Sequence, residues 1–356
     1  MMKTKLYKRK KLGKWALLLA LLPLLSACGL GGSPAKNAAE SIDPPPTAAE
    51  QSMLQKAEAA SAPGDPSDVV TVYLLDSHGY LAPMSLRTGG SQDSAATSAE
   101  QAIAWMTANK QLTDQLPPGF TAVLPEGTAT NSVKQIKDTI SVDFAAPFSQ
   151  IPAKQERKVI EALVWTLTEL PGVDKVKLSV GGKPIRAMPA SHLPVDTVLT
   201  RGFGINIESR ADVELSRSMG VTLYFSAQTK GGEGYFVPVT RLINRQADPA
   251  KAALEQLIAG PLPSTPLKAV LTSDLSIEKL TKLADTVDVS LKSEEWAPKS
   301  PVPSEMMDAL VLTLTEATGA PQVLVAMNGD DALVDSDNNT YDHPVTRPTY
   351  VNALSR

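Results

Sequence analysis

The sequence predicts an α+β protein in which two homologous α/β-sandwich domains follow a leader and a flexible tether. Three observations predict this fold class. Four blocks of sequence occur twice, in the same order along the chain. Within each copy, β-branched runs bounded by turn residues alternate with helical stripes of apolar residues. The chain has 356 residues, close to the length of two ordinary domains, and 43% of them are apolar, which suffices for globular cores.

The leader is predicted over residues 1–27. Seven Lys and Arg and no acidic residue stand in the first 14 positions, and an apolar run follows from Trp15. A basic segment, a short apolar segment and small residues are typical of a secretory signal. The apolar run is too short to span a bilayer, which takes about 20 residues. The last residues of the signal and the chain's only Cys are Leu25, Ser26, Ala27 and Cys28.

These four residues resemble the lipobox of bacterial lipoproteins. The resemblance implies that the peptide is cut before Cys28, whose thiol carries diacylglycerol, in a lipoprotein that also carries palmitate. The alternative is an ordinary signal with a stray Cys, which the position of the only Cys disfavours. Gly29 does not resemble the Asp retention signal of Gram-negative inner-membrane lipoproteins. Residues 28–67 are rich in Gly, Ser, Pro and Ala and predict a flexible tether.

The first domain is predicted over residues 68–190. Its first two strands, 70–74 and 80–85, flank a turn, and Pro83 favours a sheet edge or a bulge because proline cannot donate to a ladder. Thr97 and Glu100 form a capping box that predicts Thr97 as the N-cap of a helix. Two strands are then predicted at 133–137 and 139–144, and a closing strand at 176–180. The helix between them is predicted from the apolar stripe Val159, Leu163, Leu167 and Leu170.

The second domain is predicted over residues 215–330, with the same β-β-α-β-β-α-β order. Asp248 is the predicted N-cap of its first helix and Pro249 the first helical residue. The strongest match between the copies is ungapped: Leu-Val-Trp-Thr-Leu-Thr-Glu at 163–169 aligns with Leu-Val-Leu-Thr-Leu-Thr-Glu at 310–316. Two amphipathic helices on one face of a small sheet would make each copy an α/β sandwich.

Two further segments complete the chain. Residues 191–214 are predicted to form an ordered connector, in which 205–208 either adds a strand or rests against one of the domains. The tail, 331–356, is polar until an extended stretch at 344–352, which we expect to pair along a sheet edge.

Histidines and carboxylate pairs give little support for a chemical site. His78, His192 and His343 fall in a turn, the connector and the tail, and none has a second His or a Cys at ligand spacing. We interpret them as exposed loop histidines. The pairs Asp330–Asp331 and Glu294–Glu295 lie in predicted loops and are interpreted as solvated charge.

Motifs for catalysis and cofactor binding are also lacking in the sequence. Asp335 begins a stretch like a calcium loop, but Thr340 and Thr346 replace the Gly and the Glu that such a loop needs. The sequence has no Gly-x-x-x-x-Gly-Lys-Ser/Thr phosphate loop and no Gly-x-Ser-x-Gly elbow. We therefore expect a protein that is not an enzyme and that has no metal and no cofactor.

The sequence resembles the GerM lipoproteins of endospore-forming bacteria. The resemblance lies in the lipobox and in the duplicated blocks Val-Thr-Val/Leu-Tyr, Tyr-x-x-Pro and Leu-Val-x-Thr-Leu-Thr-Glu. The two domains of that family are of the GerMN (sporulation and spore germination) type, and the resemblance covers about residues 68–330 and the anchor. It implies a fold akin to the ring-building motif of secretion-system rings. It also implies a scaffold role in assembling the complex that joins mother cell and forespore.

The implied partners and location follow from the same resemblance. They are the membrane, through the lipid on Cys28, extracytoplasmic proteins of the sporulation complex, and a second copy of the chain. The location is the outer face of the mother-cell membrane, facing the intermembrane space. GerMN domains also occur singly in other surface lipoproteins, so the domain alone does not fix the pathway.

Two other function classes stay open. An extracytoplasmic solute-binding or cell-wall-binding lipoprotein would share the anchor but should show an aromatic cleft, and aromatic residues make up only 5% of the chain. A cell-wall enzyme would need a carboxylate or Ser/His site. A nucleic-acid partner is disfavoured because 34 Lys and Arg stand against 38 Asp and Glu. Without the leader, 27 basic residues remain against 38 acidic ones, a formal charge of −11, so an anionic membrane would repel the protein and the lipid must hold it there.

Overall fold

The computed structural model describes residues 69–87, 94–110 and 116–352. The chain divides into two units, residues 1–62 and 63–356, and every described residue belongs to the second. The predicted leader, the lipobox with Cys28 and the tether lie outside the described residues. Within the described ranges, no helix combines the length and the apolar character needed to cross a membrane.

The first repeat and the segment after it contain strands, α-helices and short 3₁₀ helices (η). In chain order they are β1 (Val69–Leu75), β2 (Leu81–Arg87), α2 (Ala95–Met106), β3 (Thr130–Ile136), β4 (Thr139–Phe144), η2 (Ala146–Gln150), α4 (Ala153–Leu167), β5 (Lys175–Val180), β6 (Lys183–Pro184), η3 (Arg201–Phe203) and β7 (Glu208–Ser209).

The second repeat has the same order of elements, which confirms the α+β class and the duplicated β-β-α-β-β-α-β pattern. Its elements are η4 (Leu215–Arg217), β8 (Ser218–Gln228), β9 (Gly234–Asn244), α5 (Pro249–Ile258), β10 (Ser276–Leu283), β11 (Thr286–Lys292), α6 (Ser304–Thr318), β12 (Gln322–Met327) and β13 (Val345–Thr346).

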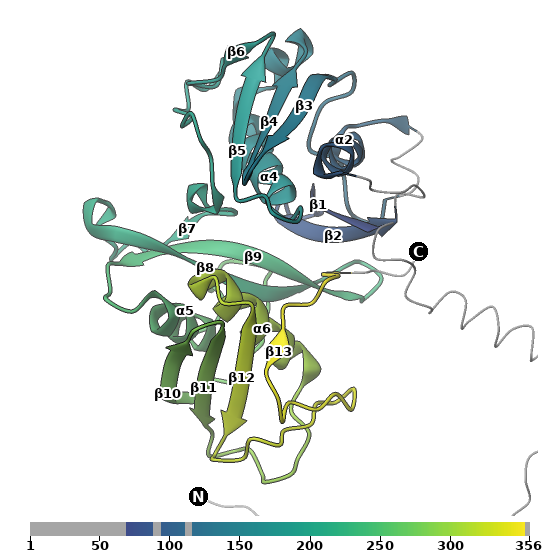
Figure 1. The fold of residues 1–356 in the computed structure, drawn as a ribbon. Helices are drawn as coiled ribbons and strands as arrows, with labels where there is room; N and C mark the ends of the chain where they lie inside the picture. Colours follow the sequence, from purple (N-terminus) through teal and green to yellow (C-terminus); the bar gives the residue numbers. More distant parts are fainter. Residues whose placement is uncertain (1–68, 88–93, 111–115, 353–356) are drawn as a thin grey trace, which may run out of the picture. The chain divides into compact units, whose positions relative to one another are not determined.

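Each repeat has three layers. Strands β1 and β2 form an antiparallel hairpin of their own, separate from the mixed sheet β3-β4-β5-β6 (Figure 1). Helices α2 and α4 both contact β1, while α2 also contacts β3 and α4 contacts β5, so the helices lie between hairpin and sheet. The two helices cover one face of the mixed sheet, as expected, and the hairpin packs on the opposite side of the helices, a layer that the sequence did not predict. The second repeat follows the same plan, with α5 and α6 between β8 and the sheet β10-β11-β12-β13.

This layering explains the burial of the long helices. A helix covered on two sides has little surface left for solvent, and Trp165 and Thr166 of α4 and Leu312 and Thr313 of α6 are at most 1% exposed. Each long helix is the crossover between two parallel strands, β4 and β5 or β11 and β12. A single cluster of buried apolar side chains contains residues of both repeats.

The segments that follow the repeats lie along the edges of the sheets. In the tail, β13 pairs antiparallel with β12 through Val323 and Val345, at the sheet edge as expected. At the same edge of the first repeat, Leu199 forms a bridge with Val176. The predicted connector strand is shorter and later than 205–208: β7 pairs with β9 over Glu208 and Ser209.

Helix ends agree with the sequence in one repeat and differ in the other. Asp248 caps α5 by accepting a hydrogen bond from the Lys251 amide at 3.0 Å, as predicted. The prediction of Thr97 as the cap of α2 is wrong, because Ser94 accepts from the Thr97 amide at 3.2 Å and Thr97 lies in the first turn. Ser and Thr are both favourable N-cap residues, and because Ser94 and Thr97 lie three positions apart, the sequence allows the helix to begin after either one. Leu170 lies beyond the end of α4.

Candidate functional site

The residues weighed in the sequence as possible ligands are separate from one another. His78, His192 and His343 are all exposed. Asp335 is 1% exposed, and its carboxylate accepts hydrogen bonds from the Asp337 and Asn339 amides, the Asn339 side chain and the Tyr341 hydroxyl. Within residues 69–87, 94–110 and 116–352, no group of three or more His, Cys, Asp and Glu side chains is placed to hold a metal ion.

The polar groups that the fold does bring together lie at the seam, the region where the hairpins β1–β2 and β8–β9 meet. In each repeat, an equivalent hydrogen bond connects the hairpin to the long helix. The Tyr73 amide donates to Thr166 Oγ1 at 2.9 Å, and the Tyr224 amide donates to Thr313 Oγ1 at 3.2 Å. Both threonines are fully buried. The first Thr of the repeated Leu-Val-x-Thr-Leu-Thr-Glu block therefore satisfies a strand amide that would otherwise lack a partner.

The Glu that ends this block in each copy, Glu169 and Glu316, belongs to a group of charges shared by the two repeats. We call it the seam cluster, and its members are Tyr73, Glu169, Arg201, Tyr224, Glu316 and Arg347. The Arg201 guanidinium lies 2.7 Å from Glu169 Oε1, just beyond the end of α4, and 2.6 Å from Glu316 Oε2 of α6, and so bridges the two repeats. It also lies 4.6 Å above the centre of the Trp165 ring and donates to Thr168 Oγ1.

The second arginine of the seam cluster holds its place by different contacts. Arg347 donates to the Tyr224 hydroxyl at 2.8 Å and lies 5.3 Å from the centre of that ring. Its ion pairs are longer than those of Arg201, 3.6 Å to Glu169 and 3.7 Å to Glu316. Arg201 therefore makes the shorter ionic bridge between the repeats, and Arg347 closes the cluster.

The members of the seam cluster stabilise one another's charge states. Burial alone would raise the pKa of the Glu169 carboxyl, but Arg201, Arg347 and the Tyr73 hydroxyl hold that pKa below its usual value. Burial opposes the charge of Arg201, yet Glu169 and Glu316 outweigh it and raise the pKa of Arg201. Burial, followed by Glu169, raises the pKa of Tyr73. These pKa directions favour a charged Glu169, a charged Arg201 and a protonated Tyr73 near neutral pH, so these three groups serve to hold a geometry.

Two asparagines join the hairpins directly, and we call them the asparagine clamps. Asn206 accepts from the Leu81 amide at 2.9 Å and donates to the Leu81 and Pro238 carbonyls at 2.8 and 2.7 Å. Asn352 accepts from the Phe236 amide at 2.7 Å and donates to the Phe236 and Pro83 carbonyls, both at 2.8 Å. Each clamp thus bonds to the backbone amide and the carbonyl of one residue in its own repeat, and to one backbone carbonyl in the other repeat.

The clamps occupy equivalent positions, because Leu81 aligns with Phe236 and Pro83 with Pro238 in the repeated Tyr-x-x-Pro block. Asn206 and Asn352 both have positive φ, 46° and 55°. Asn tolerates this backbone region better than most residues, and it also has the donor and acceptor pair that a backbone amide and carbonyl require. Pro83 lies within β2, an edge strand as expected, and Pro238 lies within β9. The carbonyls of both prolines accept hydrogen bonds from the clamps.

The sequence interpretation missed the seam because its arginines and asparagines lie in the predicted connector and tail. A signal was present: Thr-Arg followed five residues later by Asn occurs at 200–206 and again at 346–352. Each copy follows the closing strand of its repeat. The block lacks apolar periodicity, so a search for strands and helices does not detect it.

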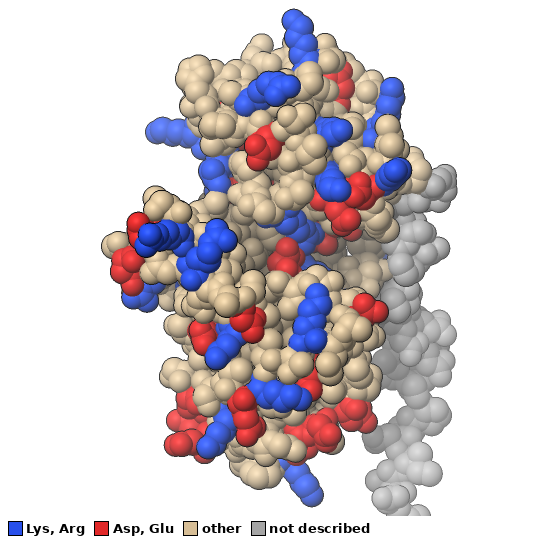
Figure 2. Space-filling view, turned by 60° about the vertical axis from the view of Figure 1, so that its left-hand side comes forward, with Lys and Arg blue, Asp and Glu red and all other residues tan. Residues whose placement is uncertain are grey.

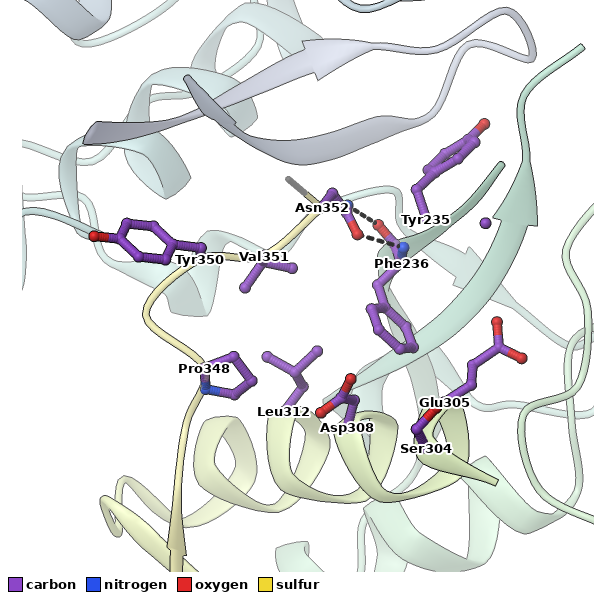
Figure 3. Close-up of a pocket in the computed structure, with 11 residues that line it drawn as sticks. Tyr235, Phe236, Ser304, Glu305, Asp308, Leu312, Pro348, Tyr350, Val351 and Asn352 are labelled. Atoms are coloured by element: carbon purple, nitrogen blue, oxygen red, sulfur yellow. Dashed lines mark hydrogen bonds between the residues drawn. The ribbon is translucent and has the colours of Figure 1, made fainter. Parts of the chain in front are cut away.

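Several cavities open near the seam. A groove of about 710 Å³ runs beside the seam cluster and is lined by its four charged members, by Asp174 and Lys175, and by threonines and small or aliphatic residues. Among the described residues that line it, none is aromatic. A smaller pocket of about 270 Å³ lies between the start of α6, β9 and the chain around Asn352 (Figure 3).

Comparisons with known proteins match both repeats. The family model described as Sporulation and spore germination (Germane) matches residues 71–186 and 222–332, more than half of the chain. The spore germination protein GerM of Bacillus subtilis (strain 168) is 32% identical over 354 residues, covering 93% of this chain and 95% of that protein. The solved tandem GerMN domains of the sporulation protein GerM from Bacillus subtilis align with a TM-score of 0.75 and 30% identity, over 80% of this chain and 99% of that chain. The chain therefore belongs to the Germane family of sporulation and spore germination proteins.

Proposed function

We propose that this protein is a lipid-anchored, non-enzymatic scaffold that helps to build the complex joining the mother cell to the forespore. The observation that carries the proposal is the 32% identity to GerM over 93% of this chain. Residues 69–356 make up less than 93% of the chain, so the aligned region must extend into the segment predicted to hold the leader and the tether. The scaffold would therefore share its whole organisation with GerM.

The predicted anchor supports the location of the scaffold. Diacylglycerol on Cys28 supplies two acyl chains, the number expected for stable membrane attachment. Anchoring in a plane raises the effective concentration of the protein toward membrane partners. We place the folded repeats on the extracytoplasmic face of the mother-cell membrane, at the end of the tether 28–67.

The seam supports a mechanical role. A scaffold must hold its binding surfaces in a fixed relation, and the two repeats share one apolar core, the ion pairs of Arg201 and the asparagine clamps. Glu169 and Glu316, which could attract a catalytic interpretation, are used in these ion pairs. On the face shown in Figure 2, basic and acidic side chains are interspersed and do not form one large patch of a single sign. On this face, the mixed charges favour contacts through shape and apolar area over a purely electrostatic contact.

The sheet edges offer such contacts. Among the described residues, β3 and β10 are the outer strands of their sheets, and no strand pairs with their outer edges. Each ends in an exposed large apolar side chain at the equivalent turn, Ile136 at 69% exposure and Leu283 at 59%. Apolar tips beside a free strand edge fit a protein partner or a second copy of the chain.

The test is complementation of a deletion strain with a fluorescent protein of the forespore complex as reporter. We expect deletion to disperse the reporter during engulfment, and Cys28→Ala to release the protein from membranes and fail to restore the pattern. Ile136→Glu with Leu283→Glu should also fail while remaining folded. The matched control is Leu215→Glu, which changes another side chain of 67% exposure away from the sheet edges. Normal reporter localisation in the deletion strain would overturn the proposal and favour solute or cell-wall binding.

A further inference from the structure

The pocket over α6 has an equivalent in the first repeat, and the comparison of the two is informative. Asp308 aligns with Glu161, Glu305 with Lys158, and Ser304 with Arg157 through the ungapped Leu-Val-x-Thr-Leu-Thr-Glu helix. The long helix and the chain around the asparagine clamp line both cavities. The second hairpin strand, β9, lines the cavity of the second repeat, whereas the turn before β2 and residues within 262–265 line that of the first.

In the first repeat, cations of the chain itself occupy the cavity. Lys158 Nζ lies 2.6 Å from Asn206 Oδ1 and 3.8 Å from Glu161 Oε2. Arg157 Nε donates to Glu161 Oε1 at 2.9 Å, and the Asn206 amide donates to Glu161 Oε2 at 3.1 Å. The buried carboxylate of Glu161, 1% exposed, is thus matched by two positive charges and a backbone donor.

In the second repeat, the same cavity lacks these cations. Ser304 and Glu305 stand in the places of Arg157 and Lys158, so one positive charge is lost and the other is reversed. Among the described residues, no hydrogen bond or ion pair reaches the half-buried carboxylate of Asp308, whereas Asn352 is clamped to Phe236 as Asn206 is to Leu81. Burial, with further contributions from Asp335, Asp337 and Glu305, raises the pKa of Asp308 to about 6.

The walls of the pocket favour a particular kind of cation. Figure 3 shows Asp308 and Leu312 projecting from α6 toward Phe236 and Val351, with Pro348 at one side. A carboxylate beside the apolar side chains of Phe236, Leu312 and Val351 suits a charged group carried on an aliphatic stem. A metal ion fits less well, since no described group of three or more acidic or His side chains is placed to hold one.

We propose that this pocket binds the ammonium group of a lysine side chain from a partner protein, in the place that Lys158 takes in the first repeat. The ammonium would pair with Asp308 and Asn352 Oδ1, and the lysine stem would lie against Phe236 and Leu312. This inference rests on the proposed scaffold function, because it names one chemical feature of a protein that the scaffold would hold. Its failure would leave that function standing, since the localisation assay does not involve the pocket.

The test is an NMR titration of the full chain with Nα-acetyl-lysine N-methylamide as the probe. We expect saturable shifts of the Phe236, Asp308 and Asn352 backbone amides and a lower titration midpoint for Asp308. The norleucine analogue, which has the stem without the charge, should shift them weakly. Asp308→Asn should weaken probe binding about tenfold or more, because a charged hydrogen bond is lost.

Two variants and a second amine make the test decisive. Glu305→Lys places a lysine at the position of Lys158 and should abolish probe binding, whereas Glu294→Lys makes the same charge change at an exposed loop position of the second repeat and should leave it intact. Absence of saturable shifts in the wild type, or equal binding of the norleucine analogue, would overturn the proposal. Tighter binding of cadaverine than of the blocked lysine would also overturn it, by assigning the pocket to a free amine.

Discussion

Replacing Asn206 by Ala should destabilise the whole folded part of the chain, although the residue lies in what the sequence presents as a connector. The side chain is 5% exposed and makes four hydrogen bonds: two with the amide and carbonyl of Leu81, one with the Pro238 carbonyl and one with Lys158. Alanine removes all four. It leaves three backbone groups at the seam without their partner, in a place where water has little access.

The magnitude follows from those groups. Each buried backbone donor or acceptor left without a partner costs about 1–3 kcal/mol. The backbone of Asn206 has a φ of 46°, and Ala in this region costs roughly a further 1 kcal/mol. Allowing for some relaxation and water entry, we expect the free energy of unfolding to fall by about 3–5 kcal/mol. Because the buried apolar cluster contains both repeats, the loss should appear in a single transition.

The assay is urea unfolding followed by tryptophan fluorescence, since Trp165 donates to the Gly204 carbonyl close to the clamp. Asn338→Ala is the matched control, because Asn338 also has a positive φ, 65°, but lies in an exposed turn. It should lose only about 1 kcal/mol. Asn206→Asp keeps the shape and the acceptor but not the donor, so it should fall between wild type and Asn206→Ala. Equal losses for Asn206→Ala and Asn338→Ala would refute the assignment of a structural role to the clamp.

Three further predictions concern the seam and the pocket. Arg201→Met should lower the free energy of unfolding by about 2–4 kcal/mol and Arg347→Met by less, because the ion pairs of Arg201 are about 1 Å shorter; urea titrations of both variants provide the comparison. The raised pKa of Asp308 means that the native protein binds more protons than the unfolded chain between about pH 4 and pH 6, so this group lowers stability as the pH rises through that window. Asp308→Asn should therefore be more stable than wild type by about 1–2 kcal/mol at pH 8 and equal to it near pH 3.5, and an equal gain at both values would contradict the assignment. Removal of residues 344–356 should destabilise the entire fold in thermal unfolding, since it deletes β13, Arg347 and Asn352.

The elements themselves were predictable because their signals are local. Alternation of buried residues in β4, the apolar stripe of α6 and the Asp248–Pro249 start of α5 depend on neighbours along the chain. The duplication added an independent check, since each copy predicts the elements of the other. The α+β class and the order of elements were therefore within reach of the sequence.

The layering and the seam were not predictable from those signals. A buried strand face shows that something covers it, but not whether the hairpin joins the sheet or packs on the far side of the helices. The same limit applies to Arg201 and Asn206, whose partners lie on other elements, such as Glu316 and Pro238. The prediction of the N-cap of α2 was wrong for a different reason, because Ser94 and Thr97 are two N-cap residues of similar preference.

The seam contains residues that make the same contacts in both repeats and residues that differ between the repeats. Thr166 and Thr313, and the two clamps, make the same bonds in both repeats, which is what holding two domains together requires. The pockets beside the clamps differ, because the first contains its own cation, Lys158, and the second does not. A cation within the chain loses no translational freedom on pairing, whereas one from another molecule must offset that loss with contacts. Occupation of the second pocket would therefore depend on the concentration of a partner, and because the repeats share one core, it would stabilise the scaffold only where that partner is present.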